Sequence, residues 1–205
     1  MKRSKILAWV VLVALATLSP LTPVQRVTAQ DLQHCVALVS PVPLDSKEAS
    51  QILEITCFST IADSISFATQ NGIILPRDAS AADAARALRQ AGQMEEPFAI
   101  ETTYVVGIYW KDSDRGGGSY IVVGSQMCGA VHYGIQDIAS QWGSQWNDAI
   151  SSAEGYANCN WVELYEHINY NYWLFGSGGA VQYCHPYCAS LGAMNDRTSS
   201  TRLVP

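Results

Sequence analysis

Residues 147–152 read NDAISS, and residues 195–200 read NDRTSS. Each stretch contains two carboxamide or carboxylate residues, then two variable residues, then a pair of serines. Taken singly, either stretch is typical of a turn, because Asn, Asp and Ser side chains bond readily to nearby backbone groups. The repeat of every constrained position indicates a shared role beyond turn formation.

Each stretch also follows a predicted β-hairpin. Residues 107–123 read GIYWKDSDRGGGSYIVV, and residues 162–175 read VELYEHINYNYWLF. Both segments contain a strand that ends in a tyrosine, Tyr109 or Tyr165, followed by a polar turn and a second strand. The serine-pair loop comes roughly thirty to forty residues later in both cases, a regular spacing of the kind that marks an internal repeat. A hairpin and a later loop, used twice, predict two consecutive Greek keys.

With these residues the sequence resembles the βγ-crystallin family. Its Greek keys combine an aromatic, glycine-bearing hairpin with a calcium loop of the form Asn/Asp-Asn/Asp-x-x-Ser/Thr-Ser. The resemblance covers roughly residues 102–205 and implies a βγ-crystallin-like sandwich. The second hairpin departs from the family pattern, with Asn171 and Tyr172 in place of glycine and Leu174 in place of serine. Asparagine tolerates a left-handed backbone, so the turn can still form.

In the resembling family two such loops lie side by side and exchange ligands, which implies two bound Ca²⁺ ions here. Calcium is a hard cation that takes six to eight oxygen ligands. The resemblance assigns hydroxyl ligands to the first serine of each pair, carbonyl ligands to the third loop residue, and crossing carboxylates to the aspartates. Ser152 and Ser200 would shape the loops instead of touching the metal. The implied set is Asn147, Asp148, Ala149, Ser151, Asn195, Asp196, Arg197 and Ser199, with one further carbonyl from each hairpin, near Trp110 and Glu166.

Residues 30–97 differ in composition from the rest of the chain, since they contain no tryptophan or tyrosine. CVALVS at 35–40 and ILEITC at 52–57 are rich in branched residues and predict short strands. Helical spacing predicts one helix within 58–72 and another within 80–92. The second has Ser80 as N-cap and Asp83 as its capping partner. These residues form a small α+β region whose role the sequence leaves open.

Beyond residue 100 the chain carries all ten tyrosines and five of the six tryptophans. Strands are predicted at 102–110, 119–125, 161–167 and 172–178, separated by Gly, Asp, Asn and Ser clusters. We therefore expect an α+β N-terminal region, a boundary near residue 97, and an all-β domain over 98–205.

The first 29 residues predict a secretory signal peptide. Lys2, Arg3 and Lys5 precede an apolar run over 6–18, and small residues at 27–29 suit cleavage after Ala29. The run of about 13 residues is shorter than the ~20 that a membrane-spanning helix needs. We expect an extracellular protein with no membrane attachment after cleavage; the alternative is a retained N-terminal anchor.

Cleavage would remove four basic and no acidic residues, which leaves 8 basic and 18 acidic residues and a net charge of −10. Nucleic-acid binding is not expected, because it depends on Lys and Arg to neutralise phosphates.

All six cysteines follow the predicted signal peptide, and an even number in an exported chain indicates three disulfides. Proximity favours Cys35 with Cys57, Cys128 with Cys159, and Cys184 with Cys188, although fifteen pairings are possible. CHPYC at 184–188 also contains His185, which raises the alternative of a zinc site, but zinc needs four ligands at recognised spacing.

Other functions have weaker support in the sequence. The histidines, His34, His132, His167 and His185, are scattered without a catalytic motif, so we expect no enzyme. Two alternatives to a calcium-stabilised protein stay open. One is a secreted protease inhibitor or killer-toxin-like protein, by analogy with secreted bacterial members of the family, with CHPYC as the candidate inhibitory loop. The other is a carbohydrate-binding module that uses Trp142, Trp146, Trp161 and Trp173.

Overall fold

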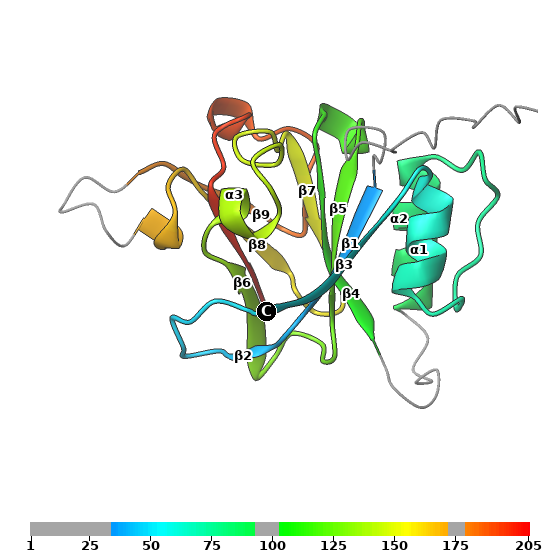
Figure 1. The fold of residues 1–205 in the computed structure, drawn as a ribbon, viewed down its shortest axis with the longest axis horizontal. Coiled ribbons are helices and arrows are strands. Elements are labelled where there is room, and N and C mark those ends of the chain that lie inside the picture. Colours follow the sequence, from blue (N-terminus) through cyan, green and yellow to red (C-terminus); the bar gives the residue numbers. More distant parts are fainter. Residues whose placement is uncertain (1–33, 93–102, 172–178) are drawn as a thin grey trace, which may run out of the picture.

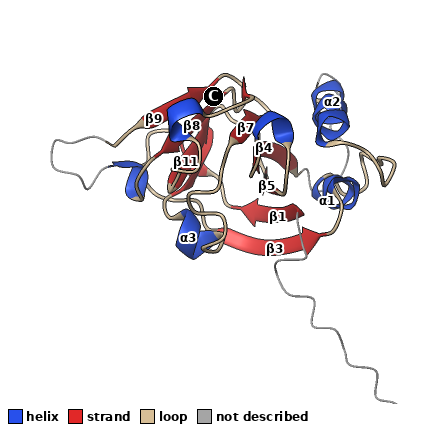
Figure 2. Ribbon diagram, turned by 90° about the horizontal axis from the view of Figure 1, so that it is seen from above, coloured by secondary structure: helices blue, strands red, loops and turns tan. Residues whose placement is uncertain are grey.

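The computed structural model of the protein describes residues 34–92, 103–171 and 179–205. Two β-sheets face each other, and two helices pack against the outer side of one of them (Figures 1 and 2). The predicted signal peptide lies outside the described residues. Within them, no helix has the length and apolar character needed to cross a membrane. The N-terminal elements are β1 (His34–Val39), β2 (Val42–Pro43), β3 (Ile52–Phe58), α1 (Ile61–Ala68) and α2 (Ala81–Ala91).

The C-terminal elements form the rest of both sheets. The first repeat contains β4 (Tyr104–Trp110), η1 (Ser113–Arg115), β5 (Ser119–Gly124), β6 (Val131–Ile135), α3 (Ile138–Gln141) and β7 (Ser152–Gly155). The second repeat contains β8 (Trp161–Tyr165), η2 (Asn169–Asn171), β9 (Val181–Cys184), β10 (Tyr187–Cys188), η3 (Gly192–Met194) and β11 (Ser200–Val204). The predicted strand at 172–178 lies outside the described residues, and β9 is the strand that pairs with β8.

The two repeats are interlocked Greek keys. One sheet has the order β10-β7-β4-β5-β1-β3, and the other has the order β2-β6-β11-β8-β9. The first repeat thus places β6 in the sheet of the second, and the second repeat places β10 in the sheet of the first. This arrangement confirms the expected sandwich of two Greek keys.

The N-terminal region joins this sandwich directly. β1 runs parallel to β5, with His34 opposite Ser119 and Val39 opposite Gly124, and β3 is antiparallel to β1. The boundary expected near residue 97 lies outside the described residues, but strands from both sides of it share one sheet. Figure 2 shows β1 and β3 beside the strands of the first repeat.

Helices α1 and α2 begin as the sequence predicts and then cover the outer face of the six-stranded sheet (Figure 1). The side chain of Ser80 accepts a hydrogen bond from the Asp83 amide, and the Asp83 carboxylate accepts one from the Ser80 amide. This capping box satisfies backbone groups that have no partner within a helix. The two helices bury their apolar faces against the sheet residues Val36, Val105, Ile108, Trp110, Ile121 and Val123.

The main core lies between the two sheets. It is rich in aromatic side chains, and Trp142 stacks on Tyr120 with ring centroids 4.0 Å apart. Tyr109 is fully buried, and its hydroxyl lies 2.9 Å from Thr201 Oγ1 in the opposite sheet. Burial raises the pKa of Tyr109 well above its ordinary value, so this hydroxyl stays protonated. Trp142 and Trp146 are therefore core residues.

The six cysteines form the three disulfides that proximity favours: Cys35 with Cys57, Cys128 with Cys159, and Cys184 with Cys188. The first joins β1 to β3, so it fixes the edge of the six-stranded sheet. The third closes the short turn between β9 and β10. Because both thiols of CHPYC are oxidised, neither is a thiolate ligand for zinc.

A buried ion cluster ties α2 to the sandwich. Glu154 on β7 has only 1% of its side chain exposed. Its carboxylate accepts a hydrogen bond from Arg115 Nε at 2.7 Å and pairs also with Arg89 of α2. Both guanidinium groups compensate the charge of the buried carboxylate, which would otherwise be very costly in the protein interior.

We expect the Glu154→Gln variant to lose roughly 3–5 kcal/mol of unfolding free energy, because it leaves the partly buried Arg115 uncompensated. Urea unfolding of the wild-type and variant proteins measures this loss. Arg86→Gln is the matched control, since the Arg86–Asp83 pair is largely exposed and such pairs contribute at most about 1 kcal/mol. A Glu154→Gln variant as stable as the control would contradict the assigned role.

His132 on β6 makes stability depend on pH. Its side chain is buried, and burial together with the positive charge of Arg202 lowers its pKa from 6.5 to about 4. Between these two pH values the unfolded chain binds a proton at His132 that the folded chain does not bind, so stability falls as the pH falls through this window. We expect this group to contribute about 3 kcal/mol of the loss. The His132→Leu variant should show a smaller decrease between pH 7 and pH 4 in urea titrations; an unchanged slope would contradict the prediction.

Candidate metal centre

The two serine-pair loops occupy equivalent positions in the two repeats. Loop 1 (residues 147–152) connects α3 to β7, and loop 2 (residues 195–200) connects η3 to β11. Because the repeats exchange strands between sheets, the two loops lie against each other. The Asp148 amide donates a hydrogen bond to the Thr198 carbonyl at 3.1 Å, and the Asp196 amide donates to the Ile150 carbonyl at 3.2 Å.

The backbone of both loops has the same unusual conformation. Asp148 and Asp196 each have a φ of 54°, in the left-handed region. Residues other than glycine rarely adopt it, although aspartate and asparagine do so more readily than most. The reciprocal amide bonds hold both aspartates in this conformation, with their side chains exposed.

Side chains cross between the loops in the same reciprocal way. Ser151 Oγ lies 3.3 Å from Asp196 Oδ1, and Ser199 Oγ lies 3.3 Å from Asp148 Oδ1. Two oxygens at this separation, each about 2.4 Å from one cation, would subtend roughly 90° at the ion, as neighbouring ligands do in common coordination geometries.

Within each loop the first asparagine supports the aspartate. Asn147 Nδ2 donates to Asp148 Oδ2 at 2.7 Å, and Asn195 Nδ2 donates to Asp196 Oδ2 at 2.6 Å. Each carboxylate therefore has one oxygen held by its own loop and the other directed to the serine of the partner loop. In this geometry the two asparagines orient the carboxylates.

The second serine of each pair fastens its loop to the preceding hairpin. Ser152 Oγ donates to the Asp112 carbonyl at 2.7 Å and accepts from the Arg115 amide at 3.2 Å. Ser200 Oγ donates to the His167 carbonyl at 2.6 Å and accepts from the Tyr170 amide at 3.0 Å. Both serines are buried, so these hydroxyls serve the shape of the loops, as the sequence indicates.

The hairpin carbonyls near the loops differ from the expected pair. The Trp110 carbonyl accepts from the Ser151 amide at 2.9 Å, and in the second repeat it is the Tyr165 carbonyl that accepts from the Ser199 amide, also at 2.9 Å. Trp110 is thus equivalent to Tyr165, and Glu166 is equivalent to Lys111. The sequence reasoning named Trp110 and missed Lys111. Lys111 follows Trp110 directly, just as Glu166 follows Tyr165.

Four backbone carbonyls around the loops could supply further oxygen donors. Within the described parts of the chain, no hydrogen bond reaches the carbonyl oxygens of Lys111, Ala149, Glu166 or Arg197. The four carbonyls form two equivalent pairs, Lys111 with Ala149 in the first repeat and Glu166 with Arg197 in the second. Together with the crossing hydroxyls and carboxylates, they give each repeat a set of oxygen donors suited to a hard cation.

Charged side chains surround the second loop more closely than the first. Arg197 pairs with Glu166, and Arg197 Nη1 donates to the Ala193 carbonyl at 3.1 Å. A hydrogen bond from the Ala180 amide, and then the bond from Arg197, lower the pKa of Glu166, which favours its charged form. The side chains of Glu166 and Arg197 thus hold the second hairpin to its loop.

Among the described residues, no cluster of carboxylate, imidazole or thiolate ligands accompanies the loops. Across residues 34–92, 103–171 and 179–205, no group of three or more His, Cys, Asp or Glu side chains is placed to hold a metal ion. His34 Nδ1 bonds with Ser119 Oγ at 2.9 Å, and His132 is buried in the fold. The oxygen donors of the loops are serine hydroxyls, backbone carbonyls and one carboxylate for each repeat.

We expect Ser152→Ala and Ser200→Ala each to reduce the unfolding free energy by roughly 1–3 kcal/mol, because each change leaves buried backbone groups without a partner. Thermal or urea unfolding measures the loss. Ser140→Ala, at an exposed serine on α3, is the control and should change stability by less than about 0.5 kcal/mol. Stabilities equal to that of the control would contradict the fastening role.

No protein-family model matches the chain, and no curated protein matches it in sequence. Among solved structures, the chain is similar to a βγ-crystallin domain from Clostridium beijerinckii, at 20% identity over 47% of this chain and 93% of that one, with a TM-score of 0.32. A βγ-crystallin domain from Flavobacterium johnsoniae has 25% identity, coverage of 47% and 91%, and a TM-score of 0.31. The N-terminal domain of protein S has 19% identity, coverage of 47% and 92%, and a TM-score of 0.32. The solved structures that resemble this chain are βγ-crystallin domains, and the likeness covers about half of its length.

Proposed function

We propose that this protein is an exported, βγ-crystallin-like calcium-binding protein in which two ions stabilise the fold. The observation that carries the proposal is the reciprocal pairing of hydroxyl and carboxylate across the two loops. Ser151 meets Asp196, and Ser199 meets Asp148, at the same distance of 3.3 Å. Turn formation alone would give each loop its own internal bonds and would not require a crossed pair.

Each ion would be held by both loops. One ion would take Ser151 Oγ, the Asp196 carboxylate and the Ala149 carbonyl; the other would take Ser199 Oγ, the Asp148 carboxylate and the Arg197 carbonyl. The carbonyls of Lys111 and Glu166 would complete the protein donors, with water in the remaining positions. This makes Asn147 and Asn195 supports of the carboxylates, and it replaces the Trp110 carbonyl by that of Lys111.

The coupling of ligands between loops explains why calcium would raise stability. Each ion bridges two segments that are almost fifty residues apart in sequence, and those segments separate when the chain unfolds. A ligand that binds only the folded state stabilises it, by about 2.7 kcal/mol per site at one hundred times its dissociation constant. With a single carboxylate for each ion, we expect a Kd of ~10⁻⁵ to 10⁻³ M.

Export is part of the proposal. It rests on the predicted signal peptide and on the three disulfides, which form and persist in oxidising compartments. Extracellular calcium concentrations in the millimolar range would suit sites of this modest affinity. The proposal assigns the protein no catalytic role.

The mature protein should unfold at a higher temperature in millimolar calcium than in chelator, and calorimetry should detect binding. Replacing Ser151 and Ser199 together by alanine removes one donor from each ion and should abolish the calcium-dependent shift. Circular dichroism checks that this variant folds, and the Ser140→Ala variant should keep the full shift. Identical melting midpoints with and without calcium, together with no heat of binding, would overturn the proposal.

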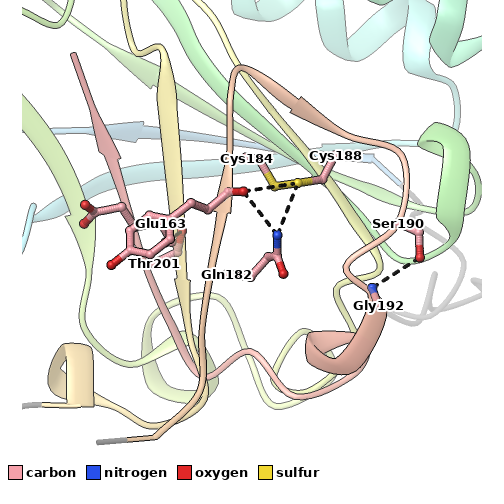
Figure 3. Close-up of a disulfide and its surroundings, with 8 residues drawn as sticks. Glu163, Gln182, Cys184, Cys188, Ser190, Gly192 and Thr201 are labelled. Carbon is pink, nitrogen blue, oxygen red and sulfur yellow. Dashed lines mark hydrogen bonds between the residues drawn. A yellow bond between two sulfur atoms is a disulfide. The ribbon is translucent and has the colours of Figure 1, made fainter.

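The inhibitor alternative gains little support from the loop that suggested it. The Cys184–Cys188 disulfide closes the turn, and Gln182 Nε2 lies 3.9 Å from Cys188 Sγ on the same side (Figure 3). The Arg115 guanidinium lies over the Tyr187 ring, 3.5 Å from the ring centroid. Within this turn, only His185 and Pro186 are exposed. Stable protein interfaces use about 20–30 residues a side, which is far more than this turn offers.

A further inference from the structure

The outer faces of the two sheets are very different. Helices α1 and α2 cover the outer face of the six-stranded sheet. Both views show these helices far from β8 and β9 of the other sheet (Figures 1 and 2). On β8, Val162 and Leu164 belong to the core between the sheets. Because side chains alternate along a strand, Trp161 and Glu163 face outward.

Aromatic side chains gather on this outward face. Trp161 is 42% exposed, and its ring centroid lies 4.2 Å from that of His185. Tyr183 is 54% exposed and lies on β9 directly opposite Glu163, two residue pairs along the ladder from Trp161 and on the same face. This aromatic patch, made of Trp161, Tyr183 and His185, lies at the end of the β8–β9 ladder remote from the hairpin loop. Exposed rings that gather on one face of a sheet can mark a binding surface.

A charged pair borders the aromatic patch. Glu163 and Arg202 are direct partners across β8 and β11, and Arg202 Nη1 lies 3.6 Å from Glu163 Oε2. The Tyr165 hydroxyl donates to the same carboxylate at 2.6 Å. Both charged side chains remain partly exposed, at 17% and 18%, and each has more hydrogen-bonding capacity than these contacts use.

We propose that this face binds a neutral carbohydrate, with the aromatic patch stacked against the apolar face of a pyranose ring and the Glu163–Arg202 pair bonded to its hydroxyls. Sugars present apolar C–H faces and many hydroxyl groups, so their sites combine aromatic rings with planar charged groups that accept and donate several hydrogen bonds. The local pair is neutral, which favours a neutral sugar over a uronic acid or an amine.

Other occupants fit this face less well. A nucleic acid also stacks on aromatic rings, but its phosphates need a basic groove, and the chain carries more acidic than basic residues. A protein partner needs roughly 800 Å² on each side, much more than three side chains at a sheet edge provide. The site is remote from the calcium loops in sequence and shares none of their residues, so it stands independently of the proposed calcium binding.

Affinity electrophoresis of the mature protein tests the proposal, in native gels that contain mixed-linkage β-glucan, xylan, galactomannan or soluble starch. Pull-down on microcrystalline cellulose and on chitin extends the panel to insoluble polymers. We expect at least one polysaccharide to retain the wild-type protein. Trp161→Ala and Tyr183→Ala should each weaken that binding about tenfold or more, since each removes a stacking ring.

Phe67→Ala is the matched control, because Phe67 is 46% exposed but lies on α1 beside the other sheet; it should bind as the wild type does. A chelator should leave the binding of the folded protein unchanged, which separates this site from the calcium loops. No retention by any polymer of the panel would overturn the proposal, and so would retention that Trp161→Ala leaves unchanged. Sedimentation that shows a dimer dissociated by Trp161→Ala would identify the patch as a contact between copies instead, and would likewise overturn it.

Discussion

The exchange of one strand between the two Greek keys is the constraint on which the rest of the structure depends. Without it each repeat would form its own sheet, and its loop would lie apart from the other. With β6 and β10 exchanged, each sheet contains strands of both repeats. The two loops then meet at the place where the chain crosses between sheets, and the backbone amide of each aspartate finds its acceptor in the opposite loop.

In this geometry the two repeats make matching hydrogen bonds, although several neighbouring side chains differ between them. The two aspartates, the four serines and the two asparagines make matching contacts in both halves. The neighbouring positions differ, because Lys111 and Ala149 in the first repeat correspond to Glu166 and Arg197 in the second. Symmetry is therefore kept in the residues that fix the loop backbone, and lost at positions whose side chains make contacts particular to one repeat, such as Lys111 over Trp146 and Arg197 with Glu166.

Local signals in the sequence predicted those features of the fold that depend on short stretches. The capping box at Ser80, the strands at β1 and β3, and the disulfides between nearby cysteines all agree with the structure. The crossed pairing of Ser151 with Asp196 could be anticipated only through the family resemblance, since no local rule relates residues so far apart. The parallel pairing of β1 with β5 was not predictable, because it depends on packing between distant segments and leaves no pattern in either strand. The Lys111 carbonyl was missed because the sequence pattern matches Tyr109 with Tyr165, whereas in the structure Trp110 is the residue equivalent to Tyr165.

The position of β1 joins the N-terminal region to the double Greek key. In an open sheet an edge strand is a hazard, since its free amides and carbonyls pair readily with other chains. β1 pairs with β5 and so moves the edge of the sheet outward to β3, which the Cys35–Cys57 disulfide fastens to β1. Helices α1 and α2 cover apolar residues of the same sheet, including Ile108 and Ile121. The first sheet of the double Greek key is thus extended by strands that precede it in the chain. The double Greek key therefore shares this second core with residues 34–92, and without that segment the β5 edge and these apolar side chains would face water.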